Sequence, residues 1–400
     1  MTLPTSAERI ALHPLTFIDE GDDVMVGRPD IDSYAVFPAD GAALLRELAD
    51  GVAPEEAARR YQERYGEPVD MVDFLETVAE LGFLRDDDDG ESGPASAETV
   101  RWQRLGRAVF SVPAWVAYAA LVAVATVLAV REPALRPSYR SLFFVRYYTV
   151  ITLVLFLGQI PGLLLHEGFH ALAGRRLGLP SRLGVSRRLY YVVAETTLNG
   201  LLSVPRRKRY LPFLAGMVAD LVLAAALVVT AAALRGPAPL AGGICMALAL
   251  ATLLRFGWQC CVHLQTDLYY VISTALGGTA LQAASRDRLA GGLRRLLRRP
   301  TPVEHPQWTD RDLALARWYA PALVLGYTYS LGLLAFVGLP AAWRVAHGLA
   351  HRLTAGGSTG EMLDAVVFLA LNGLQGVVLC IVFIRDRRRR ATRPKAVLAD

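Results

Sequence analysis

Two kinds of hydrophobic pattern divide the chain. Beyond residue 108, apolar residues form long runs, each near or above the roughly 18–20 residues needed to cross the hydrocarbon core of a bilayer. These runs occupy residues 109–130, 148–165, 211–234, 240–263, 319–342 and 362–384. The pattern predicts a polytopic α-helical membrane protein with about six transmembrane helices.

The N-terminal part follows a different pattern. Residues 14–40 alternate apolar and polar positions in short runs broken by Gly, Asp and Pro, which predicts two or three short strands. Residues 41–84 carry apolar positions at helical spacing in three segments, with breaks at "ADG" and "YGEP". We therefore expect a small α+β, winged-helix-like domain at 1–87, a solvated linker at 88–107 and a transmembrane domain at 108–400.

Composition and charge support a membrane location and suggest an orientation. The chain is 53% hydrophobic and 20% charged, whereas a typical soluble domain is about 25% charged. Its net charge of +5 comes from basic clusters that follow the second, fourth and sixth runs. Because Lys and Arg favour cytoplasmic loops, both termini are expected in the cytoplasm, and no cleavable signal peptide is expected. Anionic lipids are expected partners of these loops, and nucleic acid is not.

The segment "LLLHEGFHALAG" (163–174) sets titratable side chains inside the second run. His166 and His170 are four residues apart, so on a helix they share a face and can bind one metal ion. Glu167 can then act as general base toward a metal-bound water, as in H-E-x-x-H metalloproteases. A His or Glu in a transmembrane helix is costly and usually marks function. A Zn²⁺ site therefore explains these residues better than a pair of core histidines does.

Catalytic zinc usually has three protein ligands and one open position. In "WQCCVHLQTDLYYVI" (258–272), Asp267 is expected at the same membrane depth as the two histidines, and it is our expected third ligand. His263, one helical turn earlier, is an alternative ligand or a hydrogen-bond partner of Asp267. Asp220 either supports the metal site in this way or pairs with Arg255.

These motifs resemble the site-2 protease family of intramembrane zinc metalloproteases, over roughly residues 145–280. The resemblance implies the metal ligands His166, His170 and Asp267, with Glu167 as catalytic acid and base. The sequence departs from the family motif at one position: Leu268 stands where the family usually has the glycine of a Leu-Asp-Gly motif. "PFLAGMVADLVLA" (212–224) resembles the family's third core segment, with Gly216 retained.

The first 85 residues or so resemble the PqqD-like fold, also called the RiPP recognition element. The strand pair, "LLRELADGVAPEEAARRY" and "VDFLETVAELGFL" carry this resemblance. It implies that the leader segment of a precursor peptide adds a strand to the small sheet and contacts the last helix. An ordinary winged-helix domain is the alternative, and a DNA-binding one is disfavoured because acidic residues outnumber basic ones in the helical segments.

The expected function is that of a zinc metalloendopeptidase that cuts a precursor peptide during maturation of a ribosomal natural product. One alternative is a regulated protease that releases a membrane-anchored regulator. Another is a non-enzymatic exporter or immunity protein with a structural zinc. A CAAX-type protease would take its third ligand from a later glutamate, and only Glu304 and Glu361 follow the fourth run. Neither is expected near the histidines.

Overall fold

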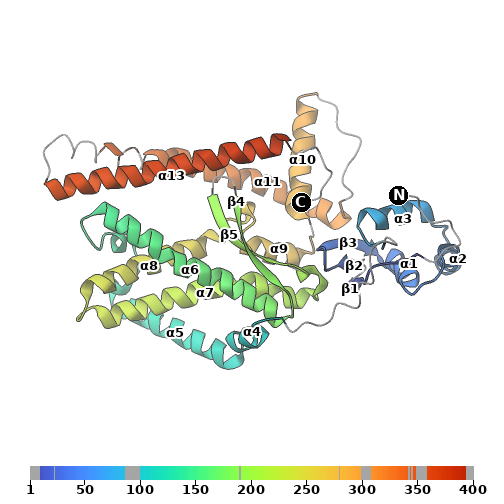
Figure 1. Cartoon of the computed structure of the whole chain (residues 1–400), viewed down its shortest axis with the longest axis horizontal. Coiled ribbons are helices and arrows are strands. Elements are labelled where there is room, and N and C mark those ends of the chain that lie inside the picture. Colours follow the sequence, from blue (N-terminus) through green and yellow to red (C-terminus); the bar gives the residue numbers. More distant parts are fainter. Residues whose placement is uncertain are drawn as a thin grey trace. The chain divides into compact units, whose positions relative to one another are not determined.

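In a computed structural model, each of the six long apolar runs contributes to a helix (Figure 1). The structure describes residues 10–21, 23–85, 100–188, 191–278, 280–298, 308–340, 343, 346–347 and 358–392. Beyond the N-terminal domain the main helices are α4 (Gln103–Val109), α5 (Val112–Arg131), α6 (Tyr148–Arg176), α7 (Arg206–Leu234), α8 (Pro239–Trp258), α9 (Asp267–Leu276), α10 (Leu281–Leu296), α11 (Asp310–Leu333) and α13 (Thr359–Thr392).

Five helices in the described part of the chain are long and apolar enough to cross a membrane. They are α5, α6, α7, α8 and α11 with its extension to Phe336, and they coincide with the first five predicted runs. The sixth run lies in α13, where the described residues contain the shorter apolar helix Met362–Leu371. The apolar side chains of these helices point outward on all sides. In α5, for example, Ala125 is the only buried residue of those that the structure describes. This pattern fits lipid contact, and the chain is a multi-pass helical membrane protein.

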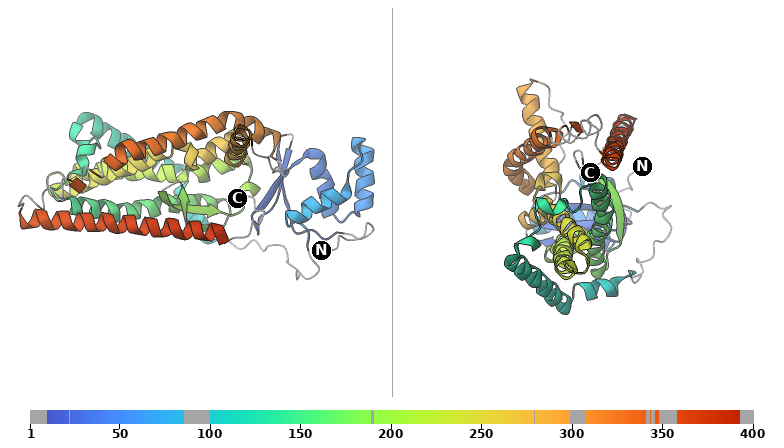
Figure 2. Two further views of the ribbon diagram at one scale, coloured as in Figure 1. Left: turned by 90° about the horizontal axis from the view of Figure 1, so that it is seen from above. Right: turned by 90° about the vertical axis from the view of Figure 1, so that its left-hand side faces the viewer.

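The N-terminal domain contains the three strands and three helices that its pattern predicts. Strands β1 (Thr16–Glu20), β2 (Asp23–Arg28) and β3 (Ser33–Pro38) pair antiparallel in the order β1-β2-β3. Helices α1 (Ala39–Ala49), α2 (Pro54–Tyr65) and α3 (Met71–Glu80) gather on one face of this sheet (Figure 2). Val24, Val26, Phe37, Leu45, Val78 and Phe83 form the core between sheet and helices.

The predicted linker at 88–107 is partly wrong. Residues 86–99 lie outside the described part of the chain, but Gln103 already begins α4. Gly106 explains how α4 packs against α6, because a Cβ at this position would collide with the carbonyl oxygen of Leu172. Residues 103–109 therefore belong to the packed helical part of the protein.

The chain divides into two compact units. The first comprises residues 1–121, 163–222 and 255–324, and the second comprises 122–162, 223–254 and 325–400. The first unit contains a hairpin of β4 (Ser181–Arg188) and β5 (Tyr191–Leu198), which connects α6 to α7. The basic residues of this segment predict a loop instead of a hairpin. Its second strand, "YVVAETTL", is rich in the β-branched and aromatic residues that favour strands, a signal that could have revealed it.

Candidate metal centre

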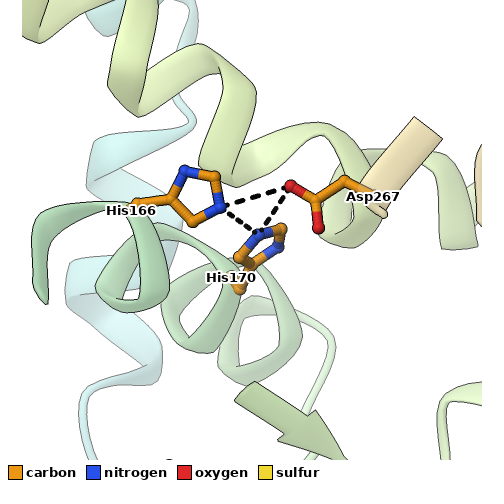
Figure 3. Close-up of side chains that lie close together, drawn as sticks. All are labelled: His166, His170 and Asp267. Atoms are coloured by element: carbon orange, nitrogen blue, oxygen red, sulfur yellow. Dashed lines mark hydrogen bonds and ion pairs between the residues drawn. The ribbon is translucent and has the colours of Figure 1, made fainter. Parts of the chain in front are cut away.

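The structure brings the three expected ligands together in the first unit (Figure 3). The Nε2 atoms of His166 and His170 lie 3.2 Å apart. Oδ2 of Asp267 lies 3.3 Å from the first of these nitrogens and 3.2 Å from the second. Both imidazoles are buried, at 4% and 8% exposure. Residues separated by nearly 100 positions in the sequence thus converge on one point.

The hydrogen bonds of the two imidazoles determine where their lone pairs point. Nδ1 of His170 lies 2.7 Å from the carbonyl oxygen of Pro212, and Nδ1 of His166 lies 3.0 Å from Oδ2 of Asp220. A carbonyl or carboxylate oxygen can only accept, so each Nδ1 must carry the proton and donate it. In the neutral ring, Nε2 then presents a lone pair. Both lone pairs face the Asp267 carboxylate.

This arrangement fits a bound cation. Two nitrogen lone pairs and a carboxylate oxygen repel one another in a buried site unless positive charge lies between them. Oδ2 of Asp267 is buried and makes no hydrogen bond within the described part of the chain. Gly216 on α7 leaves room beside the cluster, because a Cβ there would collide with Nε2 of both histidines. A donor set of two imidazoles and one carboxylate suits Zn²⁺.

Asp220 hydrogen-bonds to His166 and pairs with Arg255 at the same time, so it contacts both residues that the two alternatives require. Its side chain is 1% exposed on α7. Oδ2 accepts the hydrogen bond from His166, while Oδ1 lies 2.6 Å from Nη2 and 3.0 Å from Nε of Arg255. The guanidinium from α8 balances the buried carboxylate. The carboxylate in turn fixes the orientation of the imidazole.

Asp267 comes from a different local structure than expected. The helix of the fourth run ends at Trp258, and Asp267 is the first residue of α9. Its backbone N–H donates to Oε1 of Gln259 at 3.0 Å, and Oγ1 of Thr266 donates to the Gln259 carbonyl at 2.7 Å. Gln259, at the start of the turn that presents the carboxylate, therefore binds the two residues at the end of that turn. The positive end of α9 also favours a negative charge at this position.

The same break in the helix determines the positions of two neighbouring residues, Leu268 and His263. Gln265 adopts a left-handed backbone, with φ of 55°, whereas Leu268 lies within α9 and needs no glycine-like conformation. His263 lies in a separate 3₁₀ turn, Val262–Leu264, so it does not share a helical face with Asp267. Among the described residues, its ring is not part of the converging cluster.

Burial and charge act in opposite directions on the Asp267 carboxyl. Burial raises its pKa, and positive charge on the His170 and His166 rings, which these rings carry when they are protonated in place of a bound cation, lowers it. The net effect is a pKa well below the ordinary value for an aspartate. The residue is therefore an anion at neutral pH, the form that binds a cation.

Glu167 lies beside the cluster and is held by the β4–β5 hairpin. Its side chain is 6% exposed, and Oγ1 of Thr196 in β5 donates to its Oε2 at 2.8 Å. Glu167 and Thr196 line one cavity of about 520 Å³ together with the three expected ligands. Phe213 and Tyr270 also line this cavity, and their aromatic rings stack with centroids 5.4 Å apart. Sequence reasoning missed Thr196 because it missed the hairpin.

Other residues considered from the sequence have simpler positions. Glu304, the earlier of the two late glutamates, lies outside the described residues. Glu361 lies in the first turn of α13, before the apolar segment that begins at Met362, and its side chain is not described.

The chain has no match among family models, curated proteins or solved structures. Its chemistry must therefore be argued from the residues themselves. Their geometry provides three converging donor atoms, an acidic side chain beside them and a cavity that reaches both. Such a site can hold a divalent cation next to a general base.

Proposed function

We propose that this chain is an intramembrane zinc metalloendopeptidase of the site-2 protease type. His166, His170 and Asp267 would hold the zinc ion, and Glu167 would serve as acid and base. The observation that carries the proposal is the convergence of three lone-pair atoms beside Glu167 in one cavity. A purely structural pair of histidines would not require a buried carboxylate oxygen, Oδ2 of Asp267, aimed between their nitrogens.

The proposed chemistry divides between the metal and the side chains of the chain. Bound zinc would supply Lewis acidity for hydrolysis of a peptide bond. Glu167 would take the proton from the attacking water and deliver it to the leaving amine. Because Thr196 occupies Oε2, the other carboxylate oxygen of Glu167 is the one free for this transfer. Asp220 and the Pro212 carbonyl would keep both imidazoles in the tautomer that binds metal.

The proposed substrate is a ribosomally made precursor peptide whose leader segment binds the N-terminal domain. Support comes from the resemblance of this domain to PqqD-like domains and from its sheet order. With the order β1-β2-β3, both outer strands have a free edge among the described strands of that sheet. An extended leader could pair with such an edge through its backbone.

A comparison of cellular peptides tests the catalytic part of the proposal. The wild type and Glu167→Gln are expressed at equal levels in the host, and its peptides are compared by mass spectrometry. Glutamine keeps the size of the side chain and its bond to Thr196 but cannot accept the proton. We expect a shortened peptide in the wild type only, while the purified variant keeps its zinc. Identical peptide profiles from cells with equal protein levels would overturn the proposal.

The identity of the shortened species separates the proposed substrate from its rival. A short precursor with its leader removed would support maturation of a natural product. A fragment of a membrane-anchored regulator would favour the regulated protease instead. If Glu167→Gln fully replaces the wild type in a strain that needs this protein, a non-enzymatic role with structural zinc would take precedence.

A further inference from the structure

A second cavity in the first unit, of about 670 Å³, is lined by positive charge. Its basic residues are Arg107 in α4, Arg176 at the end of α6, and Arg207 and Lys208 in the first turn of α7. We call these four residues and the cavity between them the basic pocket. Among the described residues that line it, none is acidic.

The sequence "RRKR" (206–209) divides its charges between internal bonds and the basic pocket. The Arg206 guanidinium donates to the carbonyl oxygen of Thr274, and Arg209 donates to the carbonyls of Val204 and Leu202. Among the described residues, Arg207 and Lys208 make no such side-chain bond, and both line the basic pocket. Within the described part of the chain, no ion pair or side-chain hydrogen bond engages any of the four basic-pocket residues.

Close packing holds these like charges together. Gly106, next to Arg107, lets α4 approach the last turn of α6, where a Cβ would also lie 3.2 Å from the backbone nitrogen of Arg176. Phe110, at the base of the pocket, packs edge-on against Phe169 with ring centroids 5.7 Å apart. The backbones that carry the four exposed cations are therefore held close to one another, so their like charges gather around one cavity. A bound anion would relieve the repulsion between these charges.

The connectivity of the helices places the basic pocket at a membrane surface. Successive spans run in opposite directions, so the start of α5, the end of α6 and the start of α7 lie on one side of the bilayer. Those three points are Val112, Arg176 and Arg206. Val112 and Leu211 contribute apolar surface to the lining of the basic pocket. A site with apolar wall and positive charge at this depth matches an amphiphile whose anionic group lies at the level of lipid headgroups.

We propose that the basic pocket binds a phosphate ester, supplied in the membrane by the headgroup of an anionic phospholipid. Three guanidinium groups can each make paired hydrogen bonds to phosphate oxygens, and Lys208 adds a fourth charge. The same phosphate chemistry could come from a soluble phosphate, and the experiment below separates the two sources. This inference does not depend on proteolysis.

Native mass spectrometry of the full chain in detergent tests the proposal. The protein is titrated with phosphatidylglycerol, with phosphatidylcholine and with glycerol phosphate. We expect tight retention of phosphatidylglycerol, weak retention of phosphatidylcholine and no competition by glycerol phosphate. In a variant with both Arg107→Gln and Arg207→Gln, affinity should fall roughly 30-fold, at about fivefold for each basic residue near anionic lipid. Lys208→Gln alone should cost about fivefold.

A matched control carries Arg288→Gln and Arg295→Gln, two exposed changes on α10 that remove the same total charge. Its affinity for phosphatidylglycerol should stay within about twofold of the wild type, because these residues lie outside the basic pocket. An equal loss in control and pocket variants would overturn the proposal, as would equal retention of both lipids. Displacement of the lipid by glycerol phosphate would overturn the lipid headgroup as the occupant. Thermal unfolding in detergent, with a midpoint that should not change, shows that each variant remains folded.

Discussion

Two buried aspartates in apolar helices show how the partners of a side chain reveal its role. Asp220 on α7 lies in the first unit, and Asp364 on α13 lies in the second. Asp220 shares its oxygens between the imidazole of His166 and the guanidinium of Arg255. The carboxylate of Asp364 instead accepts the backbone N–H groups of the residues that begin α6, at 3.0 and 2.9 Å.

The difference separates a structural cap from a functional support. A carboxylate that accepts the first N–H groups of a helix satisfies donors that have no partner in the helix, and it stabilises the helix terminus. Every partner of Asp364 at this terminus is a backbone group or a hydroxyl, so none of them is set aside for a ligand. Asp220 orients an imidazole whose other nitrogen faces a cluster that fits a cation. We therefore expect loss of Asp220 to affect metal binding, and loss of Asp364 to affect stability.

The largest effect should follow from filling the space beside the cluster. Gly216→Ala adds a Cβ that would collide with Nε2 of both histidines, so zinc content should fall from nearly one ion per chain to background. The fold should persist, because alanine favours a helix over glycine by about 1 kcal/mol. Metal analysis of the purified protein measures this. Gly168→Ala on α6 is the control, since its Cβ meets nothing within 4 Å. A variant at Gly216 with full zinc content would contradict the proposed position of the ion.

Asp220→Asn should have the next largest effect. Loss of the partner that orients a metal-bound imidazole typically costs about 10–100-fold in metal affinity. The change also removes the ion pair with Arg255, whose charge then lies next to a neutral amide. Competition with a zinc chelator measures the affinity, and Asp364→Asn provides a matched change far from the cluster in sequence. Equal affinities in the two variants would remove the distinction between the two aspartates.

Thr196→Val tests the support of the proposed base, Glu167, and leaves the proposed metal ligands unchanged. Valine keeps the shape of threonine but removes the O–H that donates to Oε2 of Glu167. Hydrogen bonds to charged groups contribute about 1.5–3 kcal/mol, so we expect peptide cleavage to slow roughly tenfold or more. Zinc affinity should stay unchanged. The rate at which the shortened peptide accumulates measures the first effect, and zinc loss in Thr196→Val would show that the hairpin supports the metal instead.

The sequence predicts the parts of this protein that repeat or that lie close together in the chain. Long apolar runs need only length to indicate spans, and the spacing of His166 and His170 needs only a helix to bring them together. The position of Asp267 was reached from its expected membrane depth, although the helix carrying it was placed wrongly. Depth could be judged from the apolar run, but the turn after Trp258 depends on hydrogen bonds to the side chain and the backbone carbonyl of Gln259.

What the sequence missed depends on contacts between distant segments. Thr196 has no motif of its own, and its role follows from the packing of a hairpin against α6. Asp220 was recognised as a buried carboxyl, but one aspartate has two oxygens, and only the fold shows that each has a different partner. Gly216 was matched to a family pattern, while the reason for a glycine there lies in the two imidazoles that face it.

The smallest effect should come from Asp364→Ala, which tests the second aspartate of the comparison with Asp220. Removing both acceptor oxygens leaves two N–H groups at the start of α6 without their partner, and loss of such a cap costs about 0.5–2 kcal/mol. The free energy of unfolding should fall by that amount, measured by thermal unfolding in detergent. Asp364→Asn should give a smaller loss, because its one remaining carbonyl oxygen can still accept. Zinc affinity should match the wild type in both variants. A loss of zinc as large as that of Asp220→Asn would show that the start of α6 and the metal centre respond as one unit.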